Sequence, residues 1–170
     1  MIKKFDFGKA AVFIDAANIL YSQKTLNWKI DFQKLKDFFN KNGKIISFNY
    51  YTGIIKTNKK QNQFLKKLQS YGYNVFTKEV KFIKLQNNRY LSKGNLDVEL
   101  ALDAYRLKKD YKSLILFSGD SDFSYLIDLL KKDAKRIFVF STRGHISKEL
   151  LIRAKYIDIR KLKEEIIFNT

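Results

Sequence analysis

Short apolar segments alternate along this chain with longer segments whose apolar residues recur at helical spacing. The short segments are rich in β-branched and aromatic residues, which favour strands. We expect strands at residues 10–15, 44–51, 74–77, 113–118 and 136–140, with a weaker one at 156–159. We expect helices at residues 31–42, 57–71, 95–109, 122–132 and 146–155. This alternation predicts an α/β fold with a central, mainly parallel sheet that helices cover on both faces.

A single domain over residues 1–170 is the expected organisation, because this length suffices to enclose one core. The chain has no proline, only 7 glycines, and no repeat or low-complexity tract that would mark a linker. Residues 80–90 interrupt the alternation of strands and helices, and they predict a hairpin or an extended arm.

Several classes of protein are excluded by what the sequence lacks. The N-terminal segment has no apolar stretch of the signal-peptide kind, and no segment approaches the roughly 20 apolar residues of a membrane span. We therefore expect a cytoplasmic protein with no membrane partner. Cysteine is absent, and His145 is the only histidine, which excludes thiol chemistry and a multi-histidine zinc site within one chain. The motifs of P-loop, α/β-hydrolase and dinucleotide-binding proteins are missing as well.

The charge of the chain favours a polyanionic partner. Lysine and arginine number 34 against 17 acidic residues, which gives a formal net charge of +17. Basic side chains that neutralise phosphates release condensed counterions, so such a surface attracts nucleic acid. A coding bias towards lysine in an AT-rich genome explains the same composition without any partner, but the charge alone favours nucleic-acid binding over this bias.

Acidic residues follow two of the expected strands directly. Ligands of open α/β sheets bind beyond the carboxyl ends of the strands. Asp15 ends the first expected strand, and Asp120 and Asp122 follow the fourth. Two acids one residue apart repel each other, and Mg²⁺ or Mn²⁺ would offset that repulsion with oxygen ligands. Helix capping by Asp15 and Asp122, with Asp120 shaping a turn, explains the same residues without a metal.

Asp97 is a third acidic residue whose charge calls for a positive group nearby. On a helix over residues 95–109, successive residues turn by about 100°, and Asp97 falls on the same side as Leu100, Ala101 and Ala104. A carboxylate that faces a core is costly unless a positive group meets it, and the helix dipole offsets only about 0.3–1 kcal/mol. Asp103 lies about 9 Å further along the helix, where it is either a supporting residue or a surface ion-pair partner.

Together these acids suit metal-assisted hydrolysis of a phosphodiester. Lys93, which precedes Asp97 closely, is either a phosphate contact or one more solvated lysine. We also expect phosphate or RNA contacts from four further basic residues: Lys81, Lys84, Arg89 and Arg143.

Three motifs in this order resemble those of the NYN domain, in the LabA/DUF88-like branch of the PIN-like nuclease superfamily. The motifs are Phe13-Ile-Asp-Ala-Ala-Asn18, Lys93-Gly-Asn-Leu-Asp-Val-Glu-Leu-Ala-Leu-Asp103 and Leu116-Phe-Ser-Gly-Asp-Ser-Asp-Phe123. The resemblance covers about residues 10–160. It departs from the usual Lys-Gly-Val-Asp form, because this chain has one additional residue between Gly94 and Asp97, and Lys155 stands where the family often has an acid.

The resemblance implies a three-layer α/β/α sandwich of the PIN-like, Rossmannoid type, and a Mg²⁺- or Mn²⁺-dependent ribonuclease. It implies that Asp15, Asp97, Asp120 and Asp122 are the metal-binding and catalytic residues, with Asn18, Asp103 and Ser118 in supporting positions. The expected partner is single-stranded or structured RNA.

Two other functions compete with cleavage of RNA. The first is an RNA-binding module whose site no longer cleaves, and the second is a phosphohydrolase that acts on small phosphate esters. A Toprim-like site also combines one acid with an Asp-x-Asp pair, but there a glutamate follows the first strand, whereas this chain has Asp15. The sequence leaves open a homo-oligomer, the RNA substrate and the mode of cleavage.

Overall fold

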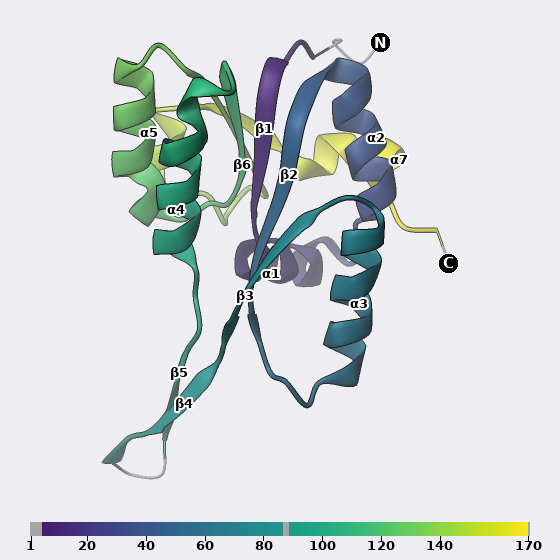
Figure 1. Ribbon diagram of the computed structural model, residues 1–170, viewed down its shortest axis with the longest axis vertical. Helices are drawn as coiled ribbons and strands as arrows, with labels where there is room; N and C mark the ends of the chain where they lie inside the picture. Colours follow the sequence, from purple (N-terminus) through teal and green to yellow (C-terminus); the bar gives the residue numbers. More distant parts are fainter. Residues whose placement is uncertain (1–4, 87–88, 170) are drawn as a thin grey trace.

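A six-stranded parallel sheet forms the centre of the protein, in the order β3-β2-β1-β6-β7-β8 (Figure 1). The computed structural model describes residues 5–86 and 89–169. All neighbouring strands of this sheet run parallel. The strands are β1 (Gly8–Asp15), β2 (Gly43–Ile54), β3 (Asn74–Glu79), β6 (Ser113–Phe117), β7 (Arg136–Ser141) and β8 (Lys155–Asp158). Each of the six predicted strands is present.

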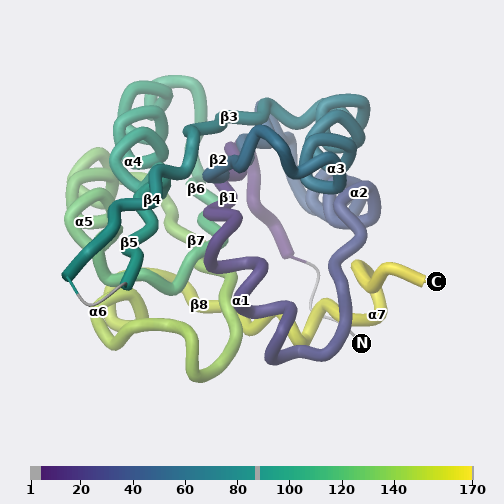
Figure 2. The backbone as a smooth tube through the Cα atoms, turned by 90° about the horizontal axis from the view of Figure 1, so that it is seen from below, coloured from purple at the N-terminus to yellow at the C-terminus, as the bar shows by residue number. Residues whose placement is uncertain are grey.

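Helices cover both faces of the sheet and complete the predicted three layers. They are α1 (Ala16–Leu26), α2 (Phe32–Asn42), α3 (Lys59–Ser70), α4 (Asp97–Arg106), α5 (Ser124–Lys132), α6 (Lys148–Leu151) and α7 (Lys163–Ile166). Seen from below, α4, α5 and α6 lie on one side of the sheet, and α2, α3 and α7 lie on the other (Figure 2).

The central strands are apolar throughout because both of their faces are buried. Residues 10–14 of β1 are fully inaccessible to solvent. Val12 and Ile14 belong to the cluster on the α2 side, whereas Ala11 and Phe13 belong to the cluster on the α4 side. Successive side chains of a strand point to opposite faces, so one strand contributes to two cores. This explains why the strands read as continuous apolar runs rather than as alternating patterns.

The order of the strands places a crevice between β1 and β6. From β1 the chain proceeds outwards to β2 and β3, whereas β6 is followed by β7 and β8 on the other side. The connections that leave β1 and β6 therefore diverge to opposite faces, which is the arrangement at which ligands bind in open α/β sheets. Asp15 ends β1 here, and Ser118 to Asp122 follow β6.

Three local predictions were wrong or incomplete. The expected helix over residues 146–155 is only the single turn α6, and Lys155 begins β8. Helix α1 was considered only as the helix that Asp15 would cap, and α7 was not among the predicted elements. Residues 57–58 lie before α3 rather than in it, and Asn58 is its N-cap, with the side chain accepting a hydrogen bond from the Gln61 amide at 3.1 Å.

The interruption at residues 80–90 is a hairpin that projects from the carboxyl edge of the sheet (Figure 1). Its antiparallel strands are β4 (Lys81–Lys84) and β5 (Tyr90–Lys93). Every described residue from 81 to 93 is exposed. The base of the hairpin packs tightly, because a Cβ on Gly53 would lie 2.7 Å from the Gly94 carbonyl oxygen, and one on Gly94 would lie 2.7 Å from Val80 Cγ2. This close packing explains why a glycine, Gly94, precedes Asp97 at the base of the hairpin.

Candidate functional site

Asp15 is held at the carboxyl end of β1 by three hydrogen bonds. Its carboxylate caps α1, accepting from the amides of Ala17 at 3.1 Å and Asn18 at 3.4 Å. The Ser118 hydroxyl, which follows β6 and is fully buried, donates to the second oxygen at 2.9 Å. The capping role considered from the sequence is therefore real. Capping occupies one oxygen, and Ser118 ties the other to the neighbouring strand.

Asp120 and Asp122 lie on the turn between β6 and α5. Asp120 Oδ1 accepts from the Asp122 amide at 3.0 Å, and the Asp120 amide donates to Ser118 Oγ at 3.2 Å. Asp120, rather than Asp122, is thus the capping residue of this turn. Gly119 allows the turn to pack against the loop after β7, since a Cβ there would lie 1.7 Å from the His145 carbonyl oxygen.

Asp97 is the first residue of α4, and its side chain reaches the same place. One carboxylate oxygen from each of Asp97, Asp120 and Asp122 lies within 4.8 Å of the other two. No side chain caps α4, and Asp97 Oδ2 accepts from Asn95 Nδ2 at 2.8 Å. The structure thus brings together two acidic segments that are separated by more than twenty residues. Asp15 is outside this group of three, but its negative charge raises the pKa of Asp97.

The acidic cluster is electrostatically unfavourable as it stands. Burial raises the pKa of Asp97 to about 6, and the charges of Asp15, Asp120 and, more weakly, Asp122 add to this, whereas Asn95 opposes it. Burial also raises the pKa of Asp15, against the hydrogen bonds from Ser118 and the α1 amides. None of the ion pairs that join described residues involves these four acids. Like charges without a cation are the condition that a metal ion would relieve.

Asn18 adds an unsatisfied oxygen in the first turn of α1. Its Oδ1 is buried and has no hydrogen-bond partner among the described residues. A buried acceptor without a donor costs about 1–3 kcal/mol, so an ordered water or a bound group is expected beside it. The supporting role predicted for Asn18 stays a prediction.

The donor set fits a hard divalent cation. It consists of oxygen atoms alone, which Mg²⁺ and Mn²⁺ prefer. Adjacent ligands of an octahedral Mg²⁺ stand about 3 Å apart and opposite ones about 4.2 Å. The oxygens of Asp97, Asp120 and Asp122, which lie within 4.8 Å of one another, would therefore move closer together to share one ion. His145 offers no alternative zinc ligand here, because its Nε2 lies 3.0 Å from Thr25 Oγ1 and its ring packs edge-on against Tyr21.

Asp103 does not join the acidic cluster. Its Oδ2 accepts from the Tyr51 hydroxyl at 2.9 Å, and its Oδ1 pairs with Arg106 at 3.1 Å. The ion pair weighed in the sequence is therefore present, and Asp103 anchors α4 to β2. Two contacts of this region were missed from the sequence. The first is the hydrogen bond from Asn95 to Asp97, which the additional residue between Gly94 and Asp97 could have indicated. The second is the hydrogen bond from Tyr51 to Asp103, which no sequence pattern near either residue indicates.

The predicted basic contacts fall in two separate places. Four of them lie on the hairpin that leads into α4: Lys81, Lys84, Arg89 and Lys93. Arg143 lies in the loop after β7, in a small cavity with Arg160 and Lys163. Among the described residues, no helix has the length and apolar character needed to span a membrane.

Comparison with known proteins assigns this fold and its motifs to one family. The family model of the NYN domain matches residues 9–160. The chain belongs to the NYN domain family. It is 35% identical over 160 residues to the Low amplitude and bright protein LabA of Synechococcus elongatus, covering 91% of this chain and 86% of that protein. NYN domains are PIN-like, and membership points to a nuclease or an RNA-related function.

A solved structure has the same overall architecture as this NYN domain. It is that of a protein of unknown function from Vibrio parahaemolyticus, with a TM-score of 0.77, 23% sequence identity and 99% of each chain covered. At this level of identity the likeness shows the fold alone.

Proposed function

We propose that this NYN domain is a metal-dependent ribonuclease that hydrolyses phosphodiester bonds of RNA with Mg²⁺ or Mn²⁺. The observation that carries the proposal is the convergence of Asp97, Asp120 and Asp122 within 4.8 Å, at the crevice between β1 and β6. The charge of the nearby Asp15 and the raised pKa of Asp97 support this proposal, because a cation would offset the repulsion among these acids.

The acids have distinct positions in this proposal. Asp97, Asp120 and Asp122 would hold the cation, and Asp15 would add its negative charge beside them. Ser118 fixes Asp15 relative to Asp120, because its hydroxyl contacts both segments. When bound, the metal supplies a hydroxide from its water and neutralises charge on the scissile phosphate. The raised pKa of Asp97 would disfavour metal binding in acidic solution.

The hairpin is the proposed RNA-binding surface. It carries Lys81, Lys84, Arg89 and Lys93 and no acidic residue. Residues 94–96 connect it to Asp97, the first residue of α4. Its register pairs Phe82 with Ser92 and Lys84 with Tyr90, so these four side chains share one face. Phe82 is 58% and Tyr90 is 64% exposed. Exposed aromatic rings beside lysines are typical of surfaces that stack the bases of single strands.

The test is cleavage of a labelled single-stranded RNA by the wild-type protein with Mn²⁺, with Mg²⁺ and with EDTA. A structured RNA and p-nitrophenyl phosphate serve as alternative substrates. We expect products from single-stranded RNA in either metal and none in EDTA. Cleavage that survives EDTA would contradict the metal-dependent mechanism.

Two other outcomes would assign a different function. Salt-sensitive binding of both RNAs with no products in either metal would indicate an RNA-binding module. Hydrolysis of p-nitrophenyl phosphate with both RNAs left intact would indicate a phosphohydrolase of small esters.

A further inference from the structure

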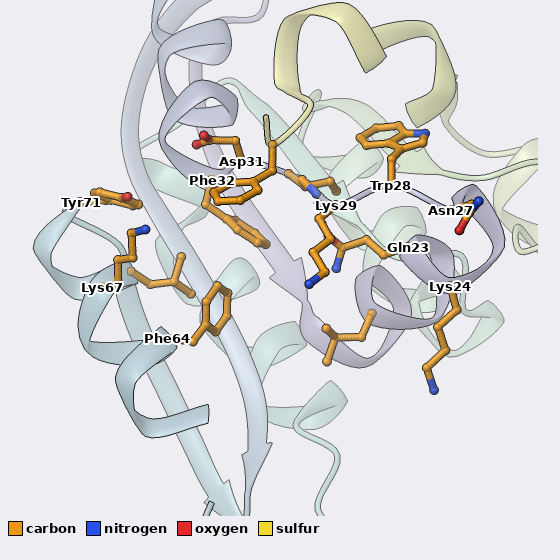
Figure 3. A pocket seen from close by; sticks show the side chains of 14 residues that line it. Gln23, Lys24, Asn27, Trp28, Lys29, Asp31, Phe32, Phe64, Lys67 and Tyr71 are labelled. Atoms are coloured by element: carbon orange, nitrogen blue, oxygen red, sulfur yellow. Dashed lines mark hydrogen bonds between the residues drawn. The ribbon is translucent and has the colours of Figure 1, made fainter. Parts of the chain in front are cut away.

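A cavity between described residues lies away from the acidic cluster. It has a volume of about 780 Å³ and opens between α1, α3, the loop after α1 and the C-terminal segment (Figure 3). Its wall is held by pairing of the chain, since the Phe168 amide donates to the Lys29 carbonyl at 2.9 Å and the Asp31 amide to the Ile166 carbonyl at 2.8 Å. The volume is in the usual range for small-molecule and cofactor sites.

Aromatic rings and apolar side chains dominate the lining of this cavity. Phe32 and Phe64 meet with centroids 5.6 Å apart at 65°, and Tyr71 and Phe168 also line the cavity. Lys67 Nζ lies 5.8 Å from the ring centroid of Tyr71 and 6.0 Å from that of Phe168. Aromatic rings that line a cavity of this size suit a flat aromatic ligand.

Charge restricts the ligand further. Lys24, Lys29 and Lys67 line the cavity, and Asp31 is the one acidic residue among its lining side chains. The Asp31 carboxylate is already engaged in capping α2, where it accepts from the amides of Gln33 at 2.9 Å and Lys34 at 3.1 Å. The cavity therefore combines aromatic walls with an excess of positive charge, which favours an anionic ligand.

A second, smaller cavity adjoins the first at Trp28. It has a volume of about 300 Å³, shares Trp28 with the larger cavity, and is lined by Arg143, Arg160 and Lys163. Arg160 is paired with Asp158. Arg143 and Lys163 take part in none of the ion pairs between described residues. An aromatic cavity and a basic one that share a single indole match the base and the phosphate of a nucleotide.

We propose that these adjoining cavities bind one nucleotide of a single-stranded RNA, with the base in the aromatic cavity and a phosphate in the basic one. The inference rests on the RNA binding of the proposed function. Helix α1 connects the two sites, because Asp15 caps its start and Gln23 lines the aromatic cavity about 12 Å further along the helix axis. A strand bound here would be anchored at a distance from the acidic cluster, on the face of the sheet opposite to α4 and α5.

Trp28 makes the proposal directly measurable, because it is the only tryptophan of the chain. The Asp120→Asn protein, without added metal, is titrated with a labelled single-stranded RNA. Trp28 emission and the anisotropy of the label are followed together, and a second titration uses AMP. We expect the emission to change with the same midpoint as the anisotropy, and AMP to bind more weakly than the RNA.

Two substitutions test the wall and the charge of the aromatic cavity. Phe64→Leu keeps an apolar side chain but removes a ring face, and we expect it to weaken RNA binding about tenfold. Lys67→Gln, on the surface of α3, is expected to weaken binding without affecting folding. Their matched controls are Tyr125→Leu and Lys132→Gln on α5, whose side chains are exposed outside both cavities. The controls should bind as the parent protein does.

The outcomes separate this inference from the proposed function. Binding seen by anisotropy, with unchanged Trp28 emission and no effect of Phe64→Leu or Lys67→Gln, would overturn the nucleotide site and leave the ribonuclease proposal intact. Binding of AMP as tight as that of the RNA would also overturn it, in favour of a free nucleotide. Absence of RNA binding by both signals would contradict the proposed function and this inference together.

Discussion

Ser118 donates its hydroxyl hydrogen bond to Asp15 across 2.9 Å, and this contact joins the carboxyl ends of the two central strands β6 and β1. The same oxygen accepts from the Asp120 amide at 3.2 Å. One buried side chain thereby fixes the relative positions of two acidic segments. Residues that orient a metal site in this way are worth about 10–100-fold in affinity or activity.

Replacement of Ser118 by alanine should therefore impair cleavage without unfolding the protein. Loss of the hydroxyl removes the hydrogen bond that opposes the effect of burial, so the pKa of Asp15 should rise further. We expect a rate lower by about 10–100-fold and an acidic limb of the pH–rate profile that moves to higher pH. Ser113→Ala is the matched control, because Ser113 is equally buried at the opposite end of β6. An unchanged pH profile in Ser118→Ala would contradict the positioning role.

Asp97→Asn should stabilise the metal-free protein at neutral pH. The folded-state pKa of about 6 lies above the ordinary 3.8, so between these values the folded state holds more protons than the unfolded one. The free energy of unfolding therefore falls as the pH rises through this range. For a half-buried, screened carboxylate we expect a gain of about 1 kcal/mol at pH 7.5 in EDTA.

Urea denaturation in EDTA measures this gain. The difference between Asp97→Asn and the wild type should shrink towards pH 4, where the wild-type carboxyl is protonated. A destabilised variant at pH 7.5 would show that Asp97 is part of a stabilising network instead.

Metal binding should weaken in acid for the same reason. A cation competes with the proton on Asp97, so affinity should fall by about tenfold per pH unit below about 6. We expect Mn²⁺ to raise the melting temperature strongly at pH 7.5 and weakly at pH 5. Equal shifts at the two pH values, or the same shifts in Asp97→Asn, would place the metal elsewhere.

The hairpin should contribute to RNA affinity through its charge. Lys81→Gln, Lys84→Gln and Arg89→Gln together remove three basic groups, which should weaken binding and lower the slope of log K against log salt by about 2 for a single strand. Lys109→Gln, Lys112→Gln and Lys132→Gln remove the same charge from exposed residues near the amino edge of the sheet. Equal losses of affinity in the two triple variants would mean that overall charge, rather than the hairpin, attracts RNA.

Much of the fold was predictable because buried parallel strands are visible as apolar runs. Leu114 to Phe117 is such a run, and each of these residues is fully buried. Helix α1 was indicated only by its capping residue Asp15, because its inward positions include the polar Ser22 beside Ala16 and Ile19, which breaks the apolar periodicity. The helix expected at 146–155 was too long because apolar residues of a loop, a helical turn and a strand follow one another there.

The acidic cluster was partly predictable from the rule that sites form beyond the carboxyl ends of strands. That rule predicted the positions of Asp15 and Asp120, and the helical periodicity predicted that Asp97 faces inwards. Contacts between elements that are distant in the sequence could not be predicted in this way. The bond between Tyr51 and Asp103 joins β2 to α4, and Trp28 lies between two cavities that distant segments enclose. The metal-binding and catalytic roles of the acids stay predictions.

The most direct test of the central claim compares Asp120→Asn with Asp110→Asn in Mn²⁺-dependent cleavage and binding of single-stranded RNA. Asparagine keeps the oxygen that accepts from the Asp122 amide, so the turn should survive while the charge is lost. Asp110 is exposed near the opposite edge of the sheet. We predict that Asp120→Asn binds RNA but forms no product, while Asp110→Asn cleaves like the wild type. Cleavage by Asp120→Asn at the wild-type rate would contradict the assignment of the acidic cluster as the catalytic metal site.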